Sequence, residues 1–380
     1  MPAAYPTLLE CFSDLPDPRV ERTRAHNLMD ILVIAICAVL CGAEGWEDMV
    51  DFAHAKRAWL HERLALPGGI PCADTFRRVL SRLDPEALQT CFRRWTAGLH
   101  ELTEGEVIAF DGKTLRHSFD NACGLAAIHM VSAWAARARL VLGAVKVAEK
   151  SNEIPAVPAL LALLDIRGCL LTTDAMSCQK TTAEQIIAQG GDYVLAVKDN
   201  QPTLSEAILL RFAYLRQHPF EAEAQGLQVC IRHNKGHARL ETRHCEVIPL
   251  QQNAPLWGDF QQEWTGLRSL ACVTCIRQIG EKVSQEVRYF ISSLPTSAPK
   301  MLSCVRQHWG IENRLHYVLD VSLDEDACRI RKDNGAEVLA VLRHITLNLL
   351  RQETTCPRGI KAKQKKAGWD NDYLGLVLIS

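Results

Sequence analysis

Three carboxylate side chains stand where a fold could bring them together into one acidic site. Asp111 follows the apolar run VIAF, Asp174 follows CLLTT, and Glu312 lies in RQHWGIENRLH, which has the spacing of an amphipathic helix. Carboxylate oxygens are the ligands that Mg²⁺ prefers, and two such ions about 4 Å apart can cut and rejoin phosphodiesters. A single Asp after a strand is more often a helix cap or a turn residue, so the hypothesis depends on all three acids converging.

The segment that holds the first two acids alternates between apolar runs typical of strands and stretches with helical spacing. The order β, β, β, α, β, α, β predicts one compact mixed sheet, with Asp111 at the end of the first strand and Asp174 just past the fourth. The predicted strands are 107–110, 128–134, 140–147, 169–172 and 192–197, and the predicted helices are 154–164, beginning near Ser151 and Asn152, and 182–189.

Five segments of different character follow one another along the chain. Residues 1–104 are predicted to form a helical N-terminal domain that binds DNA ends, and residues 105–200 the first part of an α/β core. Residues 201–297 have strands with polar faces and predict a β-rich insertion, and residues 298–352 contain closing helices with the third acid. The basic segment 353–380 is predicted to be a loosely ordered tail.

The first hundred residues contain two segments of special interest. Residues 31–43 are strongly apolar, but the run is too short to cross a bilayer and follows Asp30, so we expect a buried helix. Residues 72–83 resemble the second helix of a helix-turn-helix. An ordinary surface helix is the better explanation, because arginines opposite an apolar stripe occur in any amphipathic helix.

Composition limits the classes of function. The 380 residues are 48% hydrophobic and 23% charged, as in ordinary globular proteins. No secretory signal opens the chain, and the 15 cysteines lack the spacing of a disulfide framework, which predicts a cytoplasmic protein in a reducing compartment. No glycine-rich GxxxxGK phosphate loop is present, so a nucleotide-driven motor is not indicated.

The net charge of -1 argues against a protein that binds nucleic acid through a global positive field. Basic residues nevertheless cluster locally. For any one cluster, a solvated face is a more frequent explanation than phosphate contact. The clusters lie at residues 19–24, 232–243, 329–332 and 358–366.

Longer stretches of the chain carry a resemblance to a known family. They are FDGKTLRHS, IHMVSAW, VLGAVKVAEKSNEIPA, TTDAMSCQ, GGDYVLAVKDNQ, RYFISSL, HWGIENRLHYVLDVSLDEDACRIRKDN and LAVLRHITLNLL, with the opening LLECFSDLPDPRVERTRAHNLMDILVIAICAVLCG. Over nearly its whole length the chain resembles the transposases of bacterial insertion sequences in the ISAs-type, H-repeat-associated group. It departs from the pattern at Ser177 and Asp199, where glycine is expected.

The resemblance implies a DDE transposase with an α/β, RNase H-like mixed-sheet core, a β-rich insertion and an N-terminal helical domain. Asp111, Asp174 and Glu312 would be its catalytic and metal-binding triad, with two Mg²⁺ ions that Mn²⁺ can replace. Such an enzyme cleaves DNA at the ends of its element and transfers the 3′-hydroxyl ends into target DNA. Its partners would be terminal inverted repeats, target DNA and further copies of itself, in the cytoplasm at the nucleoid.

Seven polar residues near the acids are candidates for contacts with DNA. Two follow the first acid, three leave the last core strand at the same expected edge of the sheet, and two flank the third acid on its helix. They are Lys113, Arg116, Lys198, Asn200, Gln201, Arg306 and Arg314.

Two further side chains have competing explanations. Asp320 lies eight residues beyond Glu312 and could support a metal site from behind, although a solvated position is more frequent. Trp309 could stack on a displaced base, but a Trp beside Ile311 and Leu315 is more often part of a core.

Two other functions stay open on the sequence. The same three acids could serve a metal-dependent DNA nuclease without strand transfer, and the products of the reaction distinguish it from a transposase. The chain could also be an inactive, element-derived DNA-binding protein, which would not need Mg²⁺ for its activity.

Overall fold

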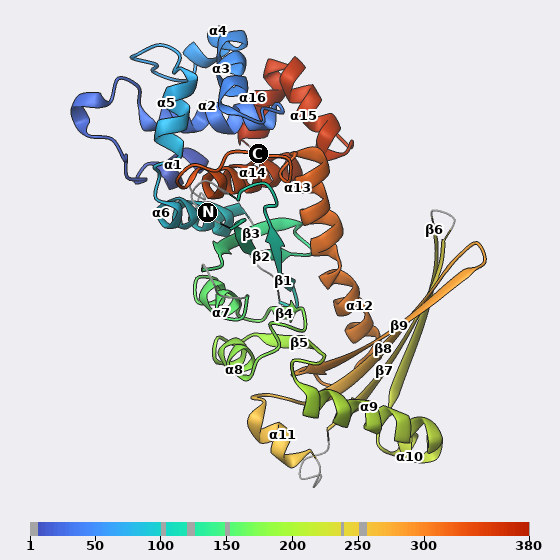
Figure 1. Cartoon of the computed structure of the whole chain (residues 1–380). Coiled ribbons are helices and arrows are strands. Elements are labelled where there is room, and N and C mark those ends of the chain that lie inside the picture. The colour runs from blue at the N-terminus through green and yellow to red at the C-terminus, as the bar shows by residue number, and fades with distance from the viewer. Residues whose placement is uncertain are drawn as a thin grey trace, which may run out of the picture.

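The computed structural model describes residues 7–99, 104–119, 126–148, 153–236, 239–250 and 257–379. Helices from both ends of the chain form a bundle at one end of the molecule, next to a nine-stranded sheet (Figure 1). The last four strands of that sheet project from the body as a long arm (Figure 1).

Five strands form the centre of the sheet. They are β1 (Val107–Thr114), β2 (His129–Ala135), β3 (Leu140–Lys146), β4 (Leu170–Thr173) and β5 (Asp192–Val197). Their spatial order is β3-β2-β1-β4-β5; β1 pairs antiparallel with β2 and parallel with β4, β2 pairs antiparallel with β3, and β4 pairs parallel with β5. This is the strand order of the RNase H-like fold, so the predicted α/β, RNase H-like mixed sheet is confirmed.

The first strand is longer than predicted, and this difference positions the first acid. The parallel pairing of β1 with β4 ends at Phe110 and Thr173, whereas its antiparallel pairing with β2 continues to Thr114. Asp111 and Asp174 are therefore each the first residue after the same pair. The two acids leave adjacent strands at one edge, as residues at the carboxyl ends of neighbouring parallel strands do.

The β-rich insertion does not make a separate sheet. Its strands are β6 (Gln228–Gly236), β7 (Arg239–Pro249), β8 (Ser269–Ile279) and β9 (Lys282–Ser292). The strand β9 pairs antiparallel with β5, and β8, β7 and β6 follow outward in that order. Three helices accompany the insertion: α9 (Pro202–Gln217), α10 (Pro219–Ala224) and α11 (Gly258–Glu263). The sequence predicted these strands but not their continuity with the core.

Helices cover both faces of the sheet. On one face α12 (Ala298–His308) lies against β1, β4 and β5, and on the other lie α7 (Ala156–Leu161) and α8 (Lys180–Ala188). Successive side chains of β1 point to opposite faces of the sheet. Ala109 belongs to the apolar cluster on the α12 face, and Phe110 belongs to the cluster on the α7 face. The predicted start of α7 near Ser151 and Asn152 lies outside the described residues.

The helical bundle combines the N-terminal helices with the helix after the third acid. The N-terminal elements are α1 (Leu8–Phe12), the 3₁₀ turn η1 (Glu21–Thr23), α2 (Leu28–Leu40), α3 (Trp46–Ala55), α4 (Arg57–His61), α5 (Ala73–Leu80) and α6 (Pro85–Leu99). The helix α2 is buried from Asp30 to Leu40, as predicted, and packs against α14 (Gly335–Gln352). None of the helices in the described residues combines the length and apolar character needed to span a bilayer.

The prediction of a loosely ordered C-terminal tail is wrong. The segment forms α15 (Ile360–Trp369) and α16 (Asn371–Ile379), whose apolar residues are buried against the bundle. A buried carboxylate anchors it: Glu353 accepts hydrogen bonds from the Tyr373 hydroxyl at 2.6 Å and the Cys356 amide at 3.0 Å. Its Oε2 also lies 3.2 Å from the ammonium of Lys363. The basic composition of the segment predicted a solvated chain, but Lys363 is buried against Glu353.

Replacement of Glu353 tests this anchor. Burial opposes the charged form, but hydrogen bonds from Thr355, Tyr373 and Lys363 outweigh it and lower the pKa of Glu353 to about 2. Glu353→Gln leaves the buried ammonium without a counter-charge, so the free energy of unfolding at pH 7 falls by about 3 kcal/mol.

A depressed pKa in the folded state stabilises the protein above the ordinary pKa of 4.5, and this contribution is lost as the pH falls toward 2. Urea unfolding should therefore give a difference between wild type and Glu353→Gln that shrinks across this range. The exposed Glu223→Gln serves as the control and should leave stability unchanged. Equal stability of Glu353→Gln and Glu223→Gln would contradict the anchor.

Candidate active site

A π-helical turn positions the third acid. The helix α12 continues through this turn, η2 (Glu312–His316), into α13 (Tyr317–Ser322). Such turns insert an extra residue into a helix and occur frequently at functional sites. Glu312 and His316 both approach the end of β1: Nδ1 of His316 lies 3.7 Å from Oδ2 of Asp111 and 3.8 Å from Oε2 of Glu312.

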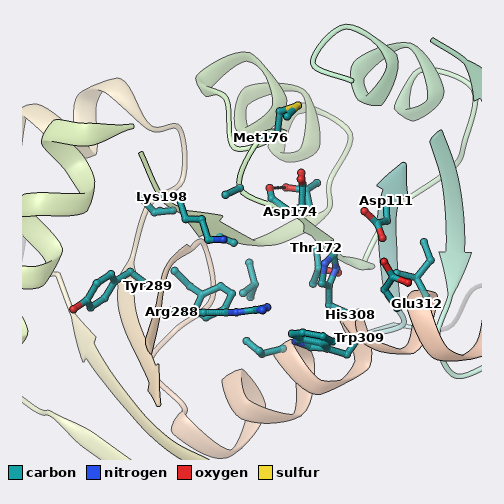
Figure 2. A pocket seen from close by; sticks show the side chains of 18 residues that line it. Asp111, Thr172, Asp174, Met176, Lys198, Arg288, Tyr289, His308, Trp309 and Glu312 are labelled. Atoms are coloured by element: carbon teal, nitrogen blue, oxygen red, sulfur yellow. Dashed lines mark hydrogen bonds between the residues drawn. The ribbon is translucent and has the colours of Figure 1, made fainter. Parts of the chain in front are cut away.

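The three acids line one cavity of about 420 Å³ (Figure 2). Asp111 from β1 and Glu312 from the π turn point toward each other, and Asp174 lies on the neighbouring wall of the same cavity (Figure 2). The ligand atoms of Asp111, Glu312 and His316 all lie within 4.8 Å of one another. Asp174 is held by its own turn, since its Oδ1 accepts the Ser177 amide at 3.1 Å.

The cavity concentrates negative charge. Burial is the main cause that raises the pKa of Asp111 to about 7, with contributions from the carboxylates of Glu312 and Asp174. Burial also raises the pKa of Asp174, whereas the imidazole of His316 lowers the pKa of Glu312. Asp111 is therefore the acid that takes up a proton near neutral pH, and a bound cation would displace that proton.

The residues present fit a divalent cation. Three carboxylates offer hard oxygen ligands, which Mg²⁺ prefers and Mn²⁺ also accepts. Among the described residues, Nε2 of His316 is buried without a hydrogen-bond partner, and the Nδ1 distances to the two acids are too long for hydrogen bonds. A cation between these groups would offset their shared charge and occupy the gap between them.

Lys113 holds the strand of the first acid to the helix of the third. Its ammonium pairs with Asp320 on α13, with Glu325 at 2.6 Å and with Asp326 at 3.5 Å, and only 12% of the side chain is exposed. Burial disfavours the charge, yet Glu325 and Asp320 outweigh it and raise the pKa of Lys113. Contrary to the prediction, this lysine faces acids rather than the cavity, and Asp320 is a structural partner rather than a solvated residue.

The other candidates for DNA contact divide into three groups. Lys198 lines the cavity and is exposed. Asn200 and Gln201 instead donate to the carbonyl of Cys178, so they support the turn after Asp174.

The three arginines are exposed in different places. Arg116 pairs with Asp326 at 3.2 Å, and Arg306 donates to Asn234 at 2.9 Å in a hollow beside the arm. Arg314 lines none of the hollows described here. Of the seven candidates, Lys198 therefore lines the cavity itself, and Arg306 lines the hollows beside the arm.

Sequence reasoning missed three residues of the site, which are His308, His316 and Arg288. His308 lines the cavity, where its Nδ1 and the Thr172 hydroxyl share a hydrogen bond of 3.0 Å and burial lowers its pKa to about 4. The spacing HxxxExxxH was the available signal for the histidines, because residues four apart lie on one side of a helix.

The core interpretation of Trp309 is wrong. Its side chain is 40% exposed at the cavity, and the guanidinium of Arg288 lies over the ring at 4.3 Å from the centroid. Ile311 and Leu315 are fully buried, so they mark the part of the helix that packs against the core. The burial of Ile311 and Leu315 therefore did not predict the burial of Trp309.

The structure requires glycine at position 112. It does not require glycine at positions 177 and 199, where the resemblance predicts it. A Cβ on Gly112 would overlap the ion pair that Glu153 Oε1 makes with His129 Nε2 at 2.5 Å. In the described part of the chain, neither Ser177 nor Asp199 has a positive φ. The serine and the aspartate therefore cause no backbone strain.

Comparison with known proteins assigns the family. Residues 102–349 match the family model described as transposase DDE domain, and residues 9–96 match the model of its associated segment, DDE_Tnp_1-associated. The chain belongs to the DDE transposase family. The resemblance seen in the sequence is thereby confirmed.

Relatives match over nearly the whole length. The "H repeat-associated putative transposase YhhI" of Escherichia coli strain K12 is 41% identical over 98% of this chain and 97% of its own. The "Putative transposase YncI" of E. coli O157:H7 is 41% identical over 98% of this chain and 95% of its own. A shorter K12 relative, "Inactive transposase YbfQ", is 44% identical over 20% of this chain and 89% of its own.

One solved structure resembles the fold distantly. The piggyBac transposase in a synaptic complex with hairpin DNA aligns with a TM-score of 0.44 and 10% identity, over 96% of this chain and 76% of its own. A likeness at this level assigns no residue and no activity.

Replacement of Lys113 distinguishes a structural lysine from a DNA contact. Lys113→Met leaves Asp320 and the buried Glu325 without their counter-charge, so the free energy of unfolding falls by about 3–5 kcal/mol. Arg116→Met is the matched control: its side chain is 78% exposed, and the change should cost less than about 1 kcal/mol. Unchanged stability of Lys113→Met in urea titrations, together with weaker DNA binding, would contradict the structural role.

Proposed function

We propose that the chain is an active DNA transposase, which cleaves at the ends of its element and joins the freed 3′-hydroxyl ends to target DNA. The observation that carries this proposal is the convergence of Asp111, Asp174 and Glu312 on one cavity that fits divalent cations. Membership of the DDE transposase family supports the reaction class.

The cofactor in this proposal is a pair of Mg²⁺ ions, for which Mn²⁺ can substitute. When bound, two such ions supply an activated oxygen nucleophile and neutralise charge on the phosphate and the leaving oxygen. Asp111 would contact both, because it stands between Asp174 and Glu312 in the cavity (Figure 2). The acids must be ionised for this, and the raised pKa of Asp111 couples ion binding to release of its proton.

Cationic side chains lie across the cavity from Asp111 and Glu312. Lys198 and Arg288 project into it from the side of β5 and β9 (Figure 2). In the proposed complex they bind the phosphates that flank the cleavage site and hold the strand against the acids. Trp309, stacked under Arg288, presents an exposed ring on which a base can stack.

The DNA path continues along a groove between α12 and the arm. This groove comprises two hollows joined by Arg243, Leu302 and Arg306, and Val305 and Trp309 connect it to the cavity. Its described lining includes five arginines but only two glutamates. These are Arg232, Arg239, Arg243, Arg277 and Arg306, with Glu241 and Glu286. A local excess of positive charge suits a phosphate backbone, whatever the net charge of the chain.

The remaining partners follow from the reaction. Joining two ends to one target requires two active sites, so the enzyme works as a homo-oligomer on paired ends, at the nucleoid in the cytoplasm. The helical domain of residues 1–104 recognises the terminal inverted repeats. A nuclease without strand transfer is the alternative that uses the same acids, and an inactive DNA-binding relic is the alternative that uses none of them.

Replacement of each acid tests the proposed chemistry. Asp111→Asn, Asp174→Asn and Glu312→Gln each remove an ionised ligand, so Mg²⁺-dependent cleavage of an end fragment should fall by roughly 1,000-fold or more while end binding persists. Asp199→Asn changes an exposed acid that does not line the cavity and should leave the rate unchanged. Full cleavage by any triad variant removes that residue from the site.

The same preparations separate the three candidate functions. A precut end with a free 3′-hydroxyl is mixed with supercoiled plasmid, and a transposase joins the two in a reaction that requires Mg²⁺. Cleavage without joined products would identify a nuclease. Binding without either product would identify an inactive relic.

Neutralising one arginine tests the groove. Arg306→Gln should weaken binding to DNA of any sequence and reduce the slope of log K against log salt by about 1, because one phosphate contact is lost. Arg167→Gln, whose side chain is 81% exposed and which lines none of the hollows described here, should leave the slope unchanged. Equal slopes for the two variants in fluorescence titrations would place the DNA elsewhere.

A further inference from the structure

We infer that His316 is a nitrogen ligand of one of the two divalent ions, which it shares with Asp111 and Glu312. This inference rests on the proposed function and adds a residue to the three acids. It makes the two ion positions chemically different: one has a nitrogen donor, and the other, between Asp111 and Asp174, has oxygen donors.

The distances suit a shared ion better than a direct contact. Nδ1 of His316 lies 3.7 Å from Asp111 Oδ2 and 3.8 Å from Glu312 Oε2, beyond hydrogen-bond range. Two donors bound to one ion at about 2.1 Å are about 3.0 Å apart at a right angle and about 4.2 Å apart when opposite. Both separations fall inside this interval, so one ion can bind all three groups with little movement.

The imidazole is also held in place for this role. Only 6% of its side chain is exposed, and the π turn places it four residues after Glu312 on the same side of the helix. Its Nε2 is buried without a hydrogen-bond partner among the described residues, whereas buried polar groups normally have one.

A nitrogen donor changes which metals bind well. Imidazole is a better ligand for the divalent ions of the first transition series than for Mg²⁺, which prefers oxygen ligands. Mn²⁺ and Co²⁺ should therefore bind this position more tightly than Mg²⁺. His316→Gln should weaken Mn²⁺ binding by roughly 10- to 100-fold and Mg²⁺ binding by less.

His308 provides the matched control. It lies on the same helical side, four residues before Glu312, and also lines the cavity. Its Nδ1 is already bonded to the Thr172 hydroxyl at 3.0 Å. His308→Gln therefore removes a neighbouring imidazole without removing the proposed ligand.

Pulsed electron paramagnetic resonance on the Mn²⁺-loaded full chain tests the inference directly. The wild type should show electron spin echo modulation from a coordinated ¹⁴N nucleus. His316→Gln should still bind Mn²⁺ through its acids but lose that modulation, and His308→Gln should keep it. Modulation that persists in His316→Gln, or is absent from wild type, overturns the inference, as does a failure of wild type to bind millimolar Mn²⁺.

The strand-joining assay on the same preparations keeps this inference apart from the proposed function. Mg²⁺-dependent joining by a wild type that lacks ¹⁴N modulation would overturn the histidine ligand and leave the transposase intact. Modulation that depends on His316, in a protein that joins no DNA, would support the ligand and contradict the proposed function.

Discussion

Three carboxylates that repel one another line one cavity, and the elements around that cavity must hold them there. Each acid comes from a different element: Asp111 from β1, Asp174 from the turn after β4, and Glu312 from the π turn. Burial of a carboxylate, together with repulsion between like charges, costs free energy, which appears as the raised pKa of Asp111. The cost is tolerated because the pairing of β1 with β4 and the buried ammonium of Lys113 hold the elements in position.

The arm extends the same site outward. Its strand β9 pairs with β5, so the sheet that carries the acids continues without a break into the arm. Arg288 on β9 therefore faces the cavity, and the arginines of the neighbouring strands line the groove beyond it. A rigid sheet can hold a long charged ligand in register with the acids, whereas a flexibly attached domain would leave that alignment to chance.

The fold was more predictable than the site, for physical reasons. Strand and helix periods are local, so β5 was predicted at its observed limits, and the three acids could be assigned to one sheet edge and a closing helix. Contacts between distant segments leave no local pattern. The sequence predicted Lys113 as a DNA contact, because nothing local shows that α13 brings Asp320 beside it. It predicted a loosely ordered tail, because nothing local shows that Glu353 pairs with the buried Lys363. The exposure of Trp309 likewise depends on which side of α12 the sheet occupies.

The central claim is that the acids form one site for two divalent ions, and anomalous diffraction from crystals soaked in Mn²⁺ tests it most directly. The account predicts two anomalous peaks about 4 Å apart, one bounded by Asp111, Glu312 and His316 and the other by Asp111 and Asp174. Both peaks should be weaker or absent in Asp111→Asn crystals. A fully occupied Mn²⁺ elsewhere, with no peak between these residues, would contradict the account.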